Sequence, residues 1–471
     1  MKLIFKTLVA ALSVAVIACT VVFAGCTVSL GADGRDGQDV SIYDIYEATN
    51  QARADEGLGQ LTFLEFISEY LSYDGTEAEQ LTSLQTAINR SLLSSVQVTA
   101  SFEVTTSSSG GFPFWQQQGG TNTYYSQGSG VIIDLNKDEG DMYIVTNCHV
   151  VFMNSADEQY STDINVYIYG KEYSLYTDSQ GDTYIDETNA IPATIVGTSI
   201  NYDIALLKVE DSDVVKNSSV MEAVWSTDEN VSVGQTVYAV GNAAGDGISA
   251  TNGIICVDSE NITLDMYDTT SNTSDDFTYR TIRTSVPIYS GNSGGGLFNA
   301  EGQLVGIINS KTVATQDGEY SDNISHALPA ANVRRVVQSM IDRYEQTGEA
   351  TNGIYKAVLG VTAQALSSSA YMNNDTNLVE IIDTVGVSEV SSGSLADGSL
   401  QAGDQITGIK ICDENGTCKE DVSVTRMYNL TEVLISAREG DSVTVTVLRS
   451  GEENPVYYTF TVASSNMQYY L

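Results

Sequence analysis

Basic residues are scarce in this sequence. Its 471 residues include 21 Lys and Arg against 61 Asp and Glu, which gives a formal net charge of −40 with histidine neutral. Because cations are few, the composition argues against nucleic acid as a partner and against charge-driven binding to anionic membranes. We interpret the excess of acidic residues as a solubility feature of an exported protein.

Histidine, proline and cysteine are also few, with two, five and six residues respectively. The Cys and His residues form no cluster with the spacing of a zinc site, so neither a metal nor another cofactor is expected. Cys412 and Cys418 flank a turn-like loop over residues 413–417. This pair could close a small disulfide if the compartment is oxidising.

Long apolar runs are absent after residue 24, so no later segment is expected to span a bilayer. The first run follows Lys2 and Lys6 and predicts an export signal. Its end, Phe23-Ala24-Gly25-Cys26, resembles the lipobox of bacterial lipoproteins, which implies cleavage before Cys26 and lipid attachment to its thiol. The alternatives are a plain secretory signal and a membrane anchor. In each case the mature chain lies outside the cytoplasm.

The segment after the signal contains no recognisable chemistry. Glycine recurs at every third position over residues 31–37, for too few repeats to form a collagen helix, and indicates a flexible stalk. Residues 41–90 carry apolar positions at helical spacing and predict a small helical segment. These positions include Leu61, Phe63, Leu64, Phe66, Ile67 and Leu71.

The glycine-rich stretch that contains Ser293 is a candidate catalytic loop. Ser293 follows Gly291-Asn292 and precedes three glycines. Glycine allows backbone conformations that a β-carbon forbids, and it makes room for another chain to approach. A nucleophilic serine needs both a free hydroxyl and nearby N–H groups that can hold a developing oxyanion. By itself, however, a glycine-rich serine loop is more often a turn.

Two further residues supply the groups that such a serine would need. His149 lies at the end of the strand-like run over residues 144–151, and histidine suits general-base chemistry near neutral pH. Asp203 precedes the apolar run over residues 204–209, where a carboxylate is costly unless it is paired. A histidine N–H is a natural partner for it.

Two rivals for these roles are disfavoured. Cys148 is a possible nucleophile, but adjacent residues of a strand point to opposite faces, so it should not share the face of His149. His326 is a possible base, because it follows the serine in the order seen in other hydrolases. No buried-carboxylate motif accompanies His326.

The order His149, Asp203, Ser293 is that of the chymotrypsin-type triad. The segments over residues 146–151, 203–209 and 291–295, with residues 128–134 and 233–242, resemble the HtrA (Deg-type) trypsin-like serine proteases. The resemblance covers residues 91 to 463. It implies a catalytic triad, an oxyanion hole made by the N–H groups of Gly291 and Ser293, and two six-stranded β-barrels. His149 and Asp203 would lie on the first barrel and Ser293 on the second.

The sequence departs from the family around the serine. Tyr289-Ser290 stands where family members usually have Asn-Pro, Gly296 replaces a common proline, and Ser285 replaces a usual aspartate. Extra glycine costs order in the unbound loop. The active loop is therefore expected to be poorly formed at rest and to become ordered when a substrate or partner binds.

Short strand-like runs separated by turns predict a mainly β protease domain. A strand over 94–104 should open it, and the polar stretch over 105–127 should be a long loop, either regulatory or a disordered insertion. The other runs lie at 130–135, 142–146, 163–169, 193–196, 204–209, 236–240, 253–257, 277–284 and 303–308. A helix from about residue 333 to Tyr344 follows, with one apolar face.

The last compact region resembles a PDZ domain (α+β). It would bind a peptide's C-terminal end as an added strand, with the carboxylate at Leu359-Gly360-Val361. A helix over 430–438 and a strand over 443–448 are expected, and Met467 to Leu471 should be a frayed tail. The predicted regions are a lipoprotein signal peptide (1–26), a stalk with a helical segment (27–90), a trypsin-like domain (91–336), a helix and linker (337–353) and the PDZ domain (354–463).

These features predict an extracytoplasmic, lipid-anchored serine endopeptidase. The resemblance implies unfolded or misfolded proteins as substrates, a role in protein quality control, C-terminal peptides as PDZ ligands, and a homotrimer. One alternative is a peptide-binding, chaperone-like lipoprotein with an idle protease site. Another is an adhesion or scaffold lipoprotein that uses only its last domain.

Overall fold

The computed structural model describes residues 49–51, 53–54, 76–106, 120–177, 183–268, 273–311, 324–374 and 376–471. The chain divides into a unit over Met1–Ser83 and a unit over Leu84–Leu471. The predicted signal peptide, Cys26, the stalk and the apolar positions from Leu61 to Leu71 lie outside the described residues. No helix among the described residues combines the length and the apolar character that a bilayer crossing requires.

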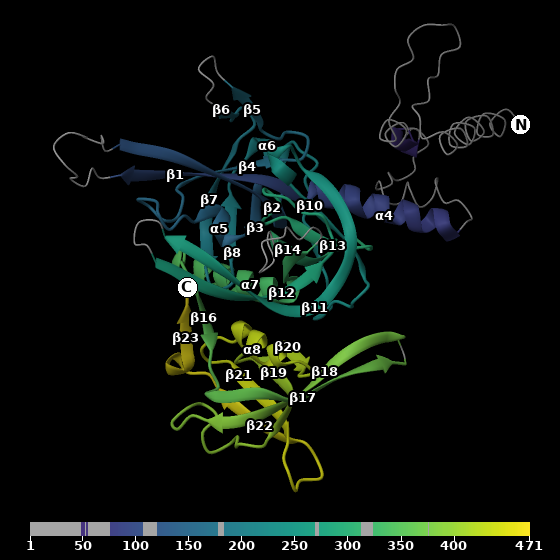
Figure 1. Ribbon diagram of the computed structural model, residues 1–471, viewed down its shortest axis with the longest axis vertical. Coiled ribbons are helices and arrows are strands. Elements are labelled where there is room, and N and C mark those ends of the chain that lie inside the picture. Colours follow the sequence, from purple (N-terminus) through teal and green to yellow (C-terminus); the bar gives the residue numbers. More distant parts are fainter. Residues whose placement is uncertain are drawn as a thin grey trace, which may run out of the picture. The chain divides into compact units, whose positions relative to one another are not determined.

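Six antiparallel strands form a closed barrel in the order β1-β2-β3-β8-β7-β4 (Figure 1). They are β1 (Ser95–Thr106), β2 (Gly120–Asn136), β3 (Asp141–Thr146), β4 (Asp163–Ile168), β7 (Ile191–Ser199) and β8 (Ile204–Val209). Alternating side chains on β1, among them Val96 and Val98, are fully buried in the barrel core. On β8, Leu207 packs into this core and Leu206 into a second cluster shared with the next barrel, so both faces of β8 are buried.

A second sheet has the order β13-β10-β11-β12-β15-β14-β9. Its strands are β9 (Val224–Trp225), β10 (Thr236–Gly241), β11 (Ser249–Asp268), β12 (Thr273–Thr284), β13 (Gly296–Asn299), β14 (Gln303–Lys311) and β15 (Ser325–Pro329). An additional pairing of β13 with β14 closes six of these strands on themselves, and β9 adds to β14 in parallel. The predicted trypsin-like arrangement of two barrels is confirmed.

Two long helices contribute to the core of the barrels. The end of α4 (Thr76–Leu93) places Ala87 in the shared cluster, and its Ser91 hydroxyl lies 2.9 Å from the Tyr238 hydroxyl. The apolar face of α7 (Ala330–Thr347) packs there as predicted, with Val333, Val336, Val337 and Met340 buried. Gly348 ends α7 at a φ of 69°, a conformation that glycine adopts readily. Because α7 is one continuous helix, it spans the expected domain boundary at residue 336.

Shorter elements complete the region before α7. They are α5 (Cys148–Val151), the hairpin of β5 (Ser174–Thr177) with β6 (Thr183–Asp186), α6 (Asp213–Lys216) and η1 (Ala243–Gly245). The expected loop over 105–127 is wrong at both ends, because β1 continues to Thr106 and β2 begins at Gly120. The cause is direct pairing of the two strands, which includes Thr105 with Thr121. Residues 107–119 lie outside the described residues.

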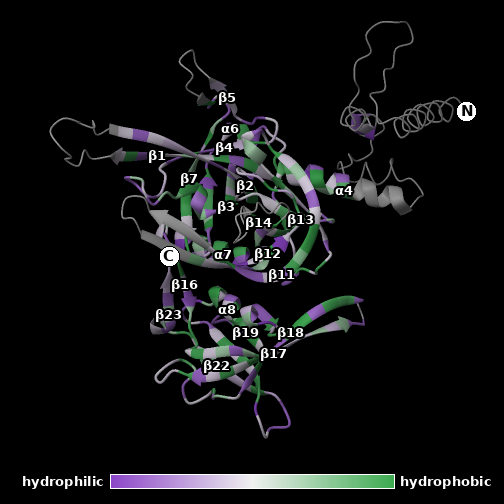
Figure 2. Ribbon diagram, viewed as in Figure 1, coloured by the Kyte–Doolittle hydropathy of each residue, from purple (hydrophilic) through white to green (hydrophobic). Residues whose placement is uncertain are grey.

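The C-terminal domain is a five-stranded sheet in the order β17-β18-β19-β21-β22, with β20 added to β19. Its elements are β16 (Ile354–Ala357), β17 (Val361–Asn373), β18 (Leu378–Val390), β19 (Gln405–Cys412), β20 (Cys418–Ser423), α8 (Met427–Val433), η2 (Leu434–Ser436), β21 (Ser442–Leu448), β22 (Val456–Thr461), η3 (Ser464–Asn466) and β23 (Met467–Tyr470). Cys412 and Cys418 form the predicted disulfide across the β19–β20 turn. Figure 2 shows hydrophobic residues along the outer β17–β18 hairpin, where Met372, Val379 and Ile381 are exposed.

Two expectations for this domain are wrong. The helix begins at Met427, three residues early, and gives way to a 3-10 turn at Leu434. The residues from Met467 are not frayed, because β23 pairs with β16 through four residues on each strand. The Leu471 carbonyl also accepts hydrogen bonds from the Asn201 N–H at 2.7 Å and from the Ser199 hydroxyl at 2.8 Å. Backbone pairing therefore orders a segment whose composition resembles a tail.

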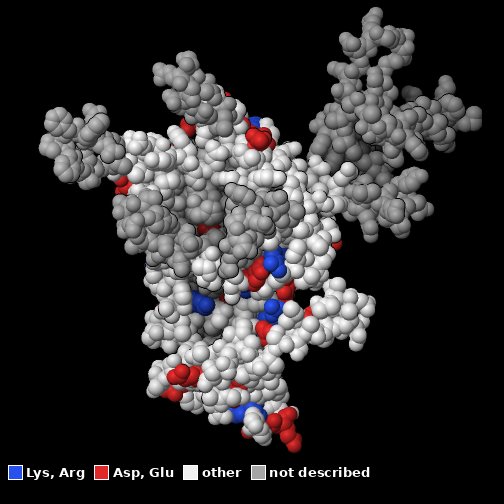
Figure 3. Space-filling model, viewed as in Figure 1, with Lys and Arg blue, Asp and Glu red and all other residues white. Residues whose placement is uncertain are grey.

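Charged pairs link the barrels to the C-terminal domain. Arg280 of β12 binds Glu432 of α8, and Arg335 of α7 binds Glu420 of β20. Arg426 pairs with Asp258, and Arg438 pairs with Asp342 at 2.8 Å. Figure 3 shows blue and red side chains next to one another at this level of the molecule.

Candidate active site

His149 lies on a short helical turn rather than on a strand. Strand β3 ends at Thr146, and α5 begins at Cys148. The expected strand through Val151 is therefore wrong, and so is the alternation argument that separated Cys148 from His149. The His149 side chain is 36% exposed, whereas Cys148, Val150 and Val151 are buried. The turn thus anchors three side chains in the core and leaves the imidazole partly buried and partly exposed.

Asp203 is buried directly beside His149. It lies immediately before β8 with a φ of 49°, and only 3% of it is exposed. One carboxylate oxygen, Oδ1, accepts the His149 backbone N–H at 3.0 Å, and the other, Oδ2, lies 2.7 Å from the His149 Nδ1. The Asn147 amide donates to the Asp203 carbonyl at 2.9 Å. These contacts hold the turn in a left-handed conformation that aspartate tolerates better than most residues.

The electrostatics of this pair favour a protonated imidazole. Burial disfavours the charge on His149, but the attraction and hydrogen bond of Asp203 outweigh it and raise the pKa of His149 above 6.5. Burial, followed by the Asp203 charge, raises the pKa of the Cys148 thiol well above its usual range. A thiol in this environment is a poor nucleophile. This is the physical ground for disfavouring Cys148.

The loop between β12 and β13 carries Ser293. Gly291 has a φ of 96°, and a β-carbon on it would lie 2.2 Å from the Asn242 carbonyl oxygen. Gly294 has a φ of 85°, and a β-carbon there would lie 2.1 Å from the Ser129 carbonyl oxygen. Both positions therefore require glycine.

Ser129 of the first barrel fixes this loop from the other side. Its N–H donates to the Ser293 carbonyl at 2.8 Å, and its hydroxyl donates to the Gly291 carbonyl at 2.7 Å. Within the described residues, the N–H groups of Gly291 and Ser293 donate no hydrogen bond. Two unpaired donors next to a serine hydroxyl are what an oxyanion hole requires.

The Ser293 hydroxyl donates to the Asn309 carbonyl at 3.1 Å, and no hydrogen bond in the described part of the chain joins it to His149. The Asn309 side-chain amide in turn donates to the Asp203 Oδ2 at 2.5 Å. Asn309 therefore connects the three predicted triad residues into one cluster. Sequence reasoning missed it. The only available signal was a polar residue directly after the apolar run that ends at Ile308.

The rival base His326 lies on β15 with different neighbours. Its Nδ1 is 3.4 Å from the Thr281 hydroxyl and 3.3 Å from Glu260 Oε1. Burial and the nearby Arg283 charge lower the pKa of His326 to about 4. Neither Thr281 nor Glu260 belongs to the Ser293 loop, so this histidine has no place in the cluster.

The predicted peptide-binding residues lie at the start of β17. Leu359 is buried, Gly360 has a φ of 75°, and Val361 begins the strand. The N–H groups of Leu359 and Gly360 donate no hydrogen bond within the described residues. Strand β17 is the first of its sheet, so one of its edges is open.

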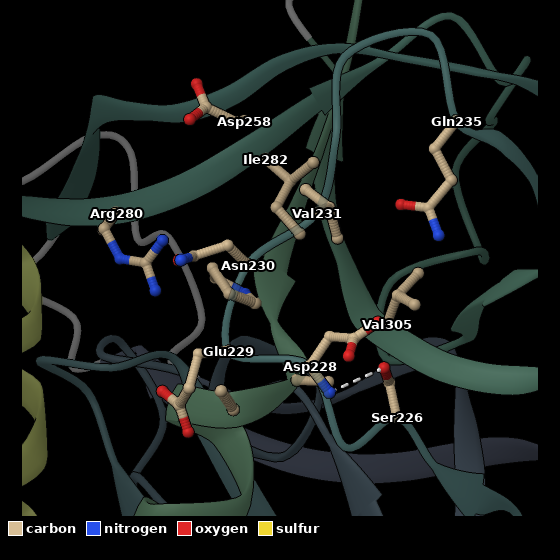
Figure 4. A pocket seen from close by; sticks show the side chains of 13 residues that line it. Ser226, Asp228, Glu229, Asn230, Val231, Gln235, Asp258, Arg280, Ile282 and Val305 are labelled. Carbon is tan, nitrogen blue, oxygen red and sulfur yellow. Dashed lines mark hydrogen bonds between the residues drawn. The ribbon is translucent and has the colours of Figure 1, made fainter. Parts of the chain in front are cut away.

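Two pockets among the described residues contain no residue of the predicted triad. Figure 4 shows a small pocket lined in part by Glu229, Asp258 and Arg280. A cavity of about 130 Å³ is lined in part by Tyr202 and Lys356. Among the described residues, no group of three or more His, Cys, Asp or Glu side chains is arranged to hold a metal ion.

The chain is similar to known peptidases over much of its length. Residues 128–307 match the family model for the trypsin-like peptidase domain. The chain is therefore a serine endopeptidase with a trypsin-like domain. It is 29% identical over 351 residues to the serine protease Do-like HtrA of Lactococcus lactis subsp. lactis, covering 73% of this chain and 72% of the relative. It is 28% identical over 337 residues to the Bacillus subtilis protein of the same description, covering 70% and 63%. The chain is thus similar to HtrA-type serine proteases.

A solved structure of the HtrA-type protease AlgW with a decapeptide is also similar, at 23% sequence identity and a TM-score of 0.45. It covers 81% of this chain and 98% of that chain.

Proposed function

We propose that Ser293, His149 and Asp203 form a catalytic triad that hydrolyses peptide bonds. Ser293 attacks the scissile carbonyl, and His149 takes its proton and then gives it to the leaving amine. Asp203 fixes the imidazole and stabilises its charged form. The observation that carries the proposal is the 2.7 Å contact between His149 Nδ1 and the buried Asp203, which leaves Nε2 as the free ring nitrogen.

The oxyanion hole consists of the Gly291 and Ser293 N–H groups in this proposal. Both donors lack a protein partner within the described residues. The Ser129 contacts with the Gly291 and Ser293 carbonyls fix the peptide groups that directly follow these two donors. Preorganised donors of this kind lower the barrier because they need not reorient as charge develops on the oxygen.

Unfolded or misfolded polypeptides are the proposed substrates, as part of extracytoplasmic protein quality control. The C-terminal domain supports this as a PDZ module. The open edge of β17 can pair with an extended peptide, and the free N–H groups of Leu359 and Gly360 can receive its carboxylate. Attachment of lipid at Cys26 and trimeric assembly stay predictions.

Labelling by a fluorophosphonate tests the triad. The full chain should gain one adduct by intact mass, on Ser293, and should cleave casein. Ser293→Ala should do neither while keeping its thermal midpoint, because the backbone carbonyl that binds Ser129 remains. Undiminished casein cleavage by Ser293→Ala would refute the assignment.

One observation favours the alternative of an idle protease site. The Ser293 hydroxyl is bound to the Asn309 carbonyl rather than to His149. If the wild-type chain binds free-carboxylate peptides but neither labels nor cleaves, the peptide-binding function stands alone. The unreacted serine would then reflect this resting contact.

A further inference from the structure

Asn309 occupies an irregular position in β14. Ile308 pairs with Ala327 of β15, and Ser310 pairs with His326, so Asn309 is an extra residue in the ladder. A bulge of this kind turns a side chain away from the regular alternation and is common next to active sites. Asn309 is only 1% exposed, and its amide reaches Asp203.

The orientation of the Asn309 amide is set by chemistry. An ionised carboxylate only accepts hydrogen bonds, so the amide nitrogen must face Asp203. The Asn309 Oδ1 is then buried with no hydrogen-bond partner among the described residues. Asn147 shows the same arrangement: its nitrogen binds the Asp203 carbonyl, and its buried Oδ1 likewise has no partner in the described part of the chain. Buried unpaired oxygens cost stability, so two of them beside Asp203, one from each asparagine, call for a functional reason.

The same residue also binds the nucleophile. The Ser293 hydroxyl donates to the Asn309 carbonyl at 3.1 Å, and the Asn309 amide donates to Asp203 at 2.5 Å. One bulged residue therefore contacts both ends of the proposed triad. A rotation of the Ser293 side chain must exchange the Asn309 carbonyl for the His149 Nε2 before attack.

We propose that Asn309 is a positioning residue of the active site, an inference that depends on the proposed triad. Its side chain locks the Asp203 carboxylate against His149 and withdraws part of the negative charge from Oδ2. Its carbonyl holds the Ser293 hydroxyl in the resting state. Once the Ser293 hydroxyl has turned from the Asn309 carbonyl to the His149 Nε2, its proton moves to Nε2 as in the triad mechanism.

Asn309→Leu in the full chain tests the side-chain role. Loss of the donor frees Asp203 to turn, and we expect kcat to fall about 10-fold to 100-fold with little change in KM. It also leaves more negative charge beside His149. The pKa that limits kcat/KM on the acid side should therefore rise. Asn309→Asp should raise this pKa further. Asn309→Ser can still donate a hydrogen bond, so its kcat and its acid-side pKa should lie between those of wild type and Asn309→Leu.

Asn299→Leu is the matched control. Asn299 is similarly buried on β13, and within the described residues its side chain forms hydrogen bonds with Gln303 alone. It should lose stability without a shift of the pH profile. If Asn309→Leu folds and keeps the wild-type rate and profile, the positioning role is refuted. If Asn309→Leu does not fold, the profile of Asn309→Ser decides in the same way. Absence of fluorophosphonate labelling in wild type would instead refute the triad.

Discussion

At the scale of single residues, Asp203 determines the chemistry of its neighbours. Its carboxylate is almost fully buried and accepts from the His149 backbone, the Asn309 amide and the His149 ring. The same charge outweighs burial and raises the pKa of His149, and it adds to burial, the larger cause, in raising the pKa of Cys148. One buried carboxylate therefore makes the histidine more basic and the adjacent thiol less reactive.

Asp203→Asn should test this electrostatic role. Because Asp203 raises the pKa of His149 above 6.5, wild-type activity should appear only as pH rises through that raised pKa. The variant should lose about 10⁴-fold in kcat, as in the chymotrypsin-type precedent, because asparagine stabilises the wrong imidazole tautomer. Its acid limb should move toward lower pH, measured with a fluorogenic peptide. An unchanged limb would contradict the assignment of His149 as the base.

Alkylation with iodoacetamide should separate the two free thiols of the described chain. Cys148 is buried with a raised pKa, whereas Cys256 is partly exposed. We expect the folded protein to react at Cys256 and not at Cys148, and the denatured protein to react at both. Peptide mapping reads out the sites, and Cys256→Ser is the control. Fast native labelling of Cys148 would mean that the α5 turn opens readily.

At the scale of elements, the sequence pattern predicts most strands but not their irregular ends. Alternating or continuous apolar runs give β3, β8, β10 and β21 within one or two residues, because burial dictates those patterns. Pairing between distant segments leaves no such pattern, so the Thr105–Thr121 pairing and β23 were missed. The residues of the proposed triad stand out in the sequence because each carries its own chemistry. Asn309 does not, because its role depends on a bulge.

Deleting Met467–Leu471 should reveal what β23 contributes. The deletion removes the β16–β23 pairing and the Tyr355–Tyr469 ring contact. It also removes the Leu471 carbonyl, which accepts hydrogen bonds from Asn201 and Ser199. Net hydrogen bonds are worth about 1 kcal/mol each, so we expect a loss of several kcal/mol in the free energy of unfolding. Urea titration measures it. Wild-type stability after the deletion would show that the strand pairing is dispensable.

At the scale of the molecule, ion pairs join the barrels to the C-terminal domain. Arg335 is almost fully buried on α7 and binds Glu229 of the β9–β10 loop and Glu420 of β20, each at 2.8 Å. Burial disfavours charge on Glu420, but the hydrogen bond and charge of Arg335 outweigh it and hold the pKa of Glu420 below 4.5. A network of this kind is sensitive to the loss of any one member, because the remaining charges stay buried.

Arg335→Met should therefore cost about 3–5 kcal/mol in the free energy of unfolding near neutral pH. The lowered pKa of Glu420 means that its stabilising effect is complete above pH 4.5 and is lost as pH falls through the lower folded pKa. In the variant, burial without a cation should instead raise the pKa of Glu420. The stability gap to wild type should consequently narrow in acid, as measured by urea unfolding at pH 3 to 7.

Arg334→Met is the matched control for that experiment. Arg334 is adjacent in sequence, but its side chain is 42% exposed and lies 4.0 Å from Glu229. Exposed pairs contribute about 0–1 kcal/mol, so its loss should be small at every pH. A stability gap for Arg335→Met that stays constant down to pH 3 would show that packing of the Arg335 side chain, rather than its charge, joins the two domains.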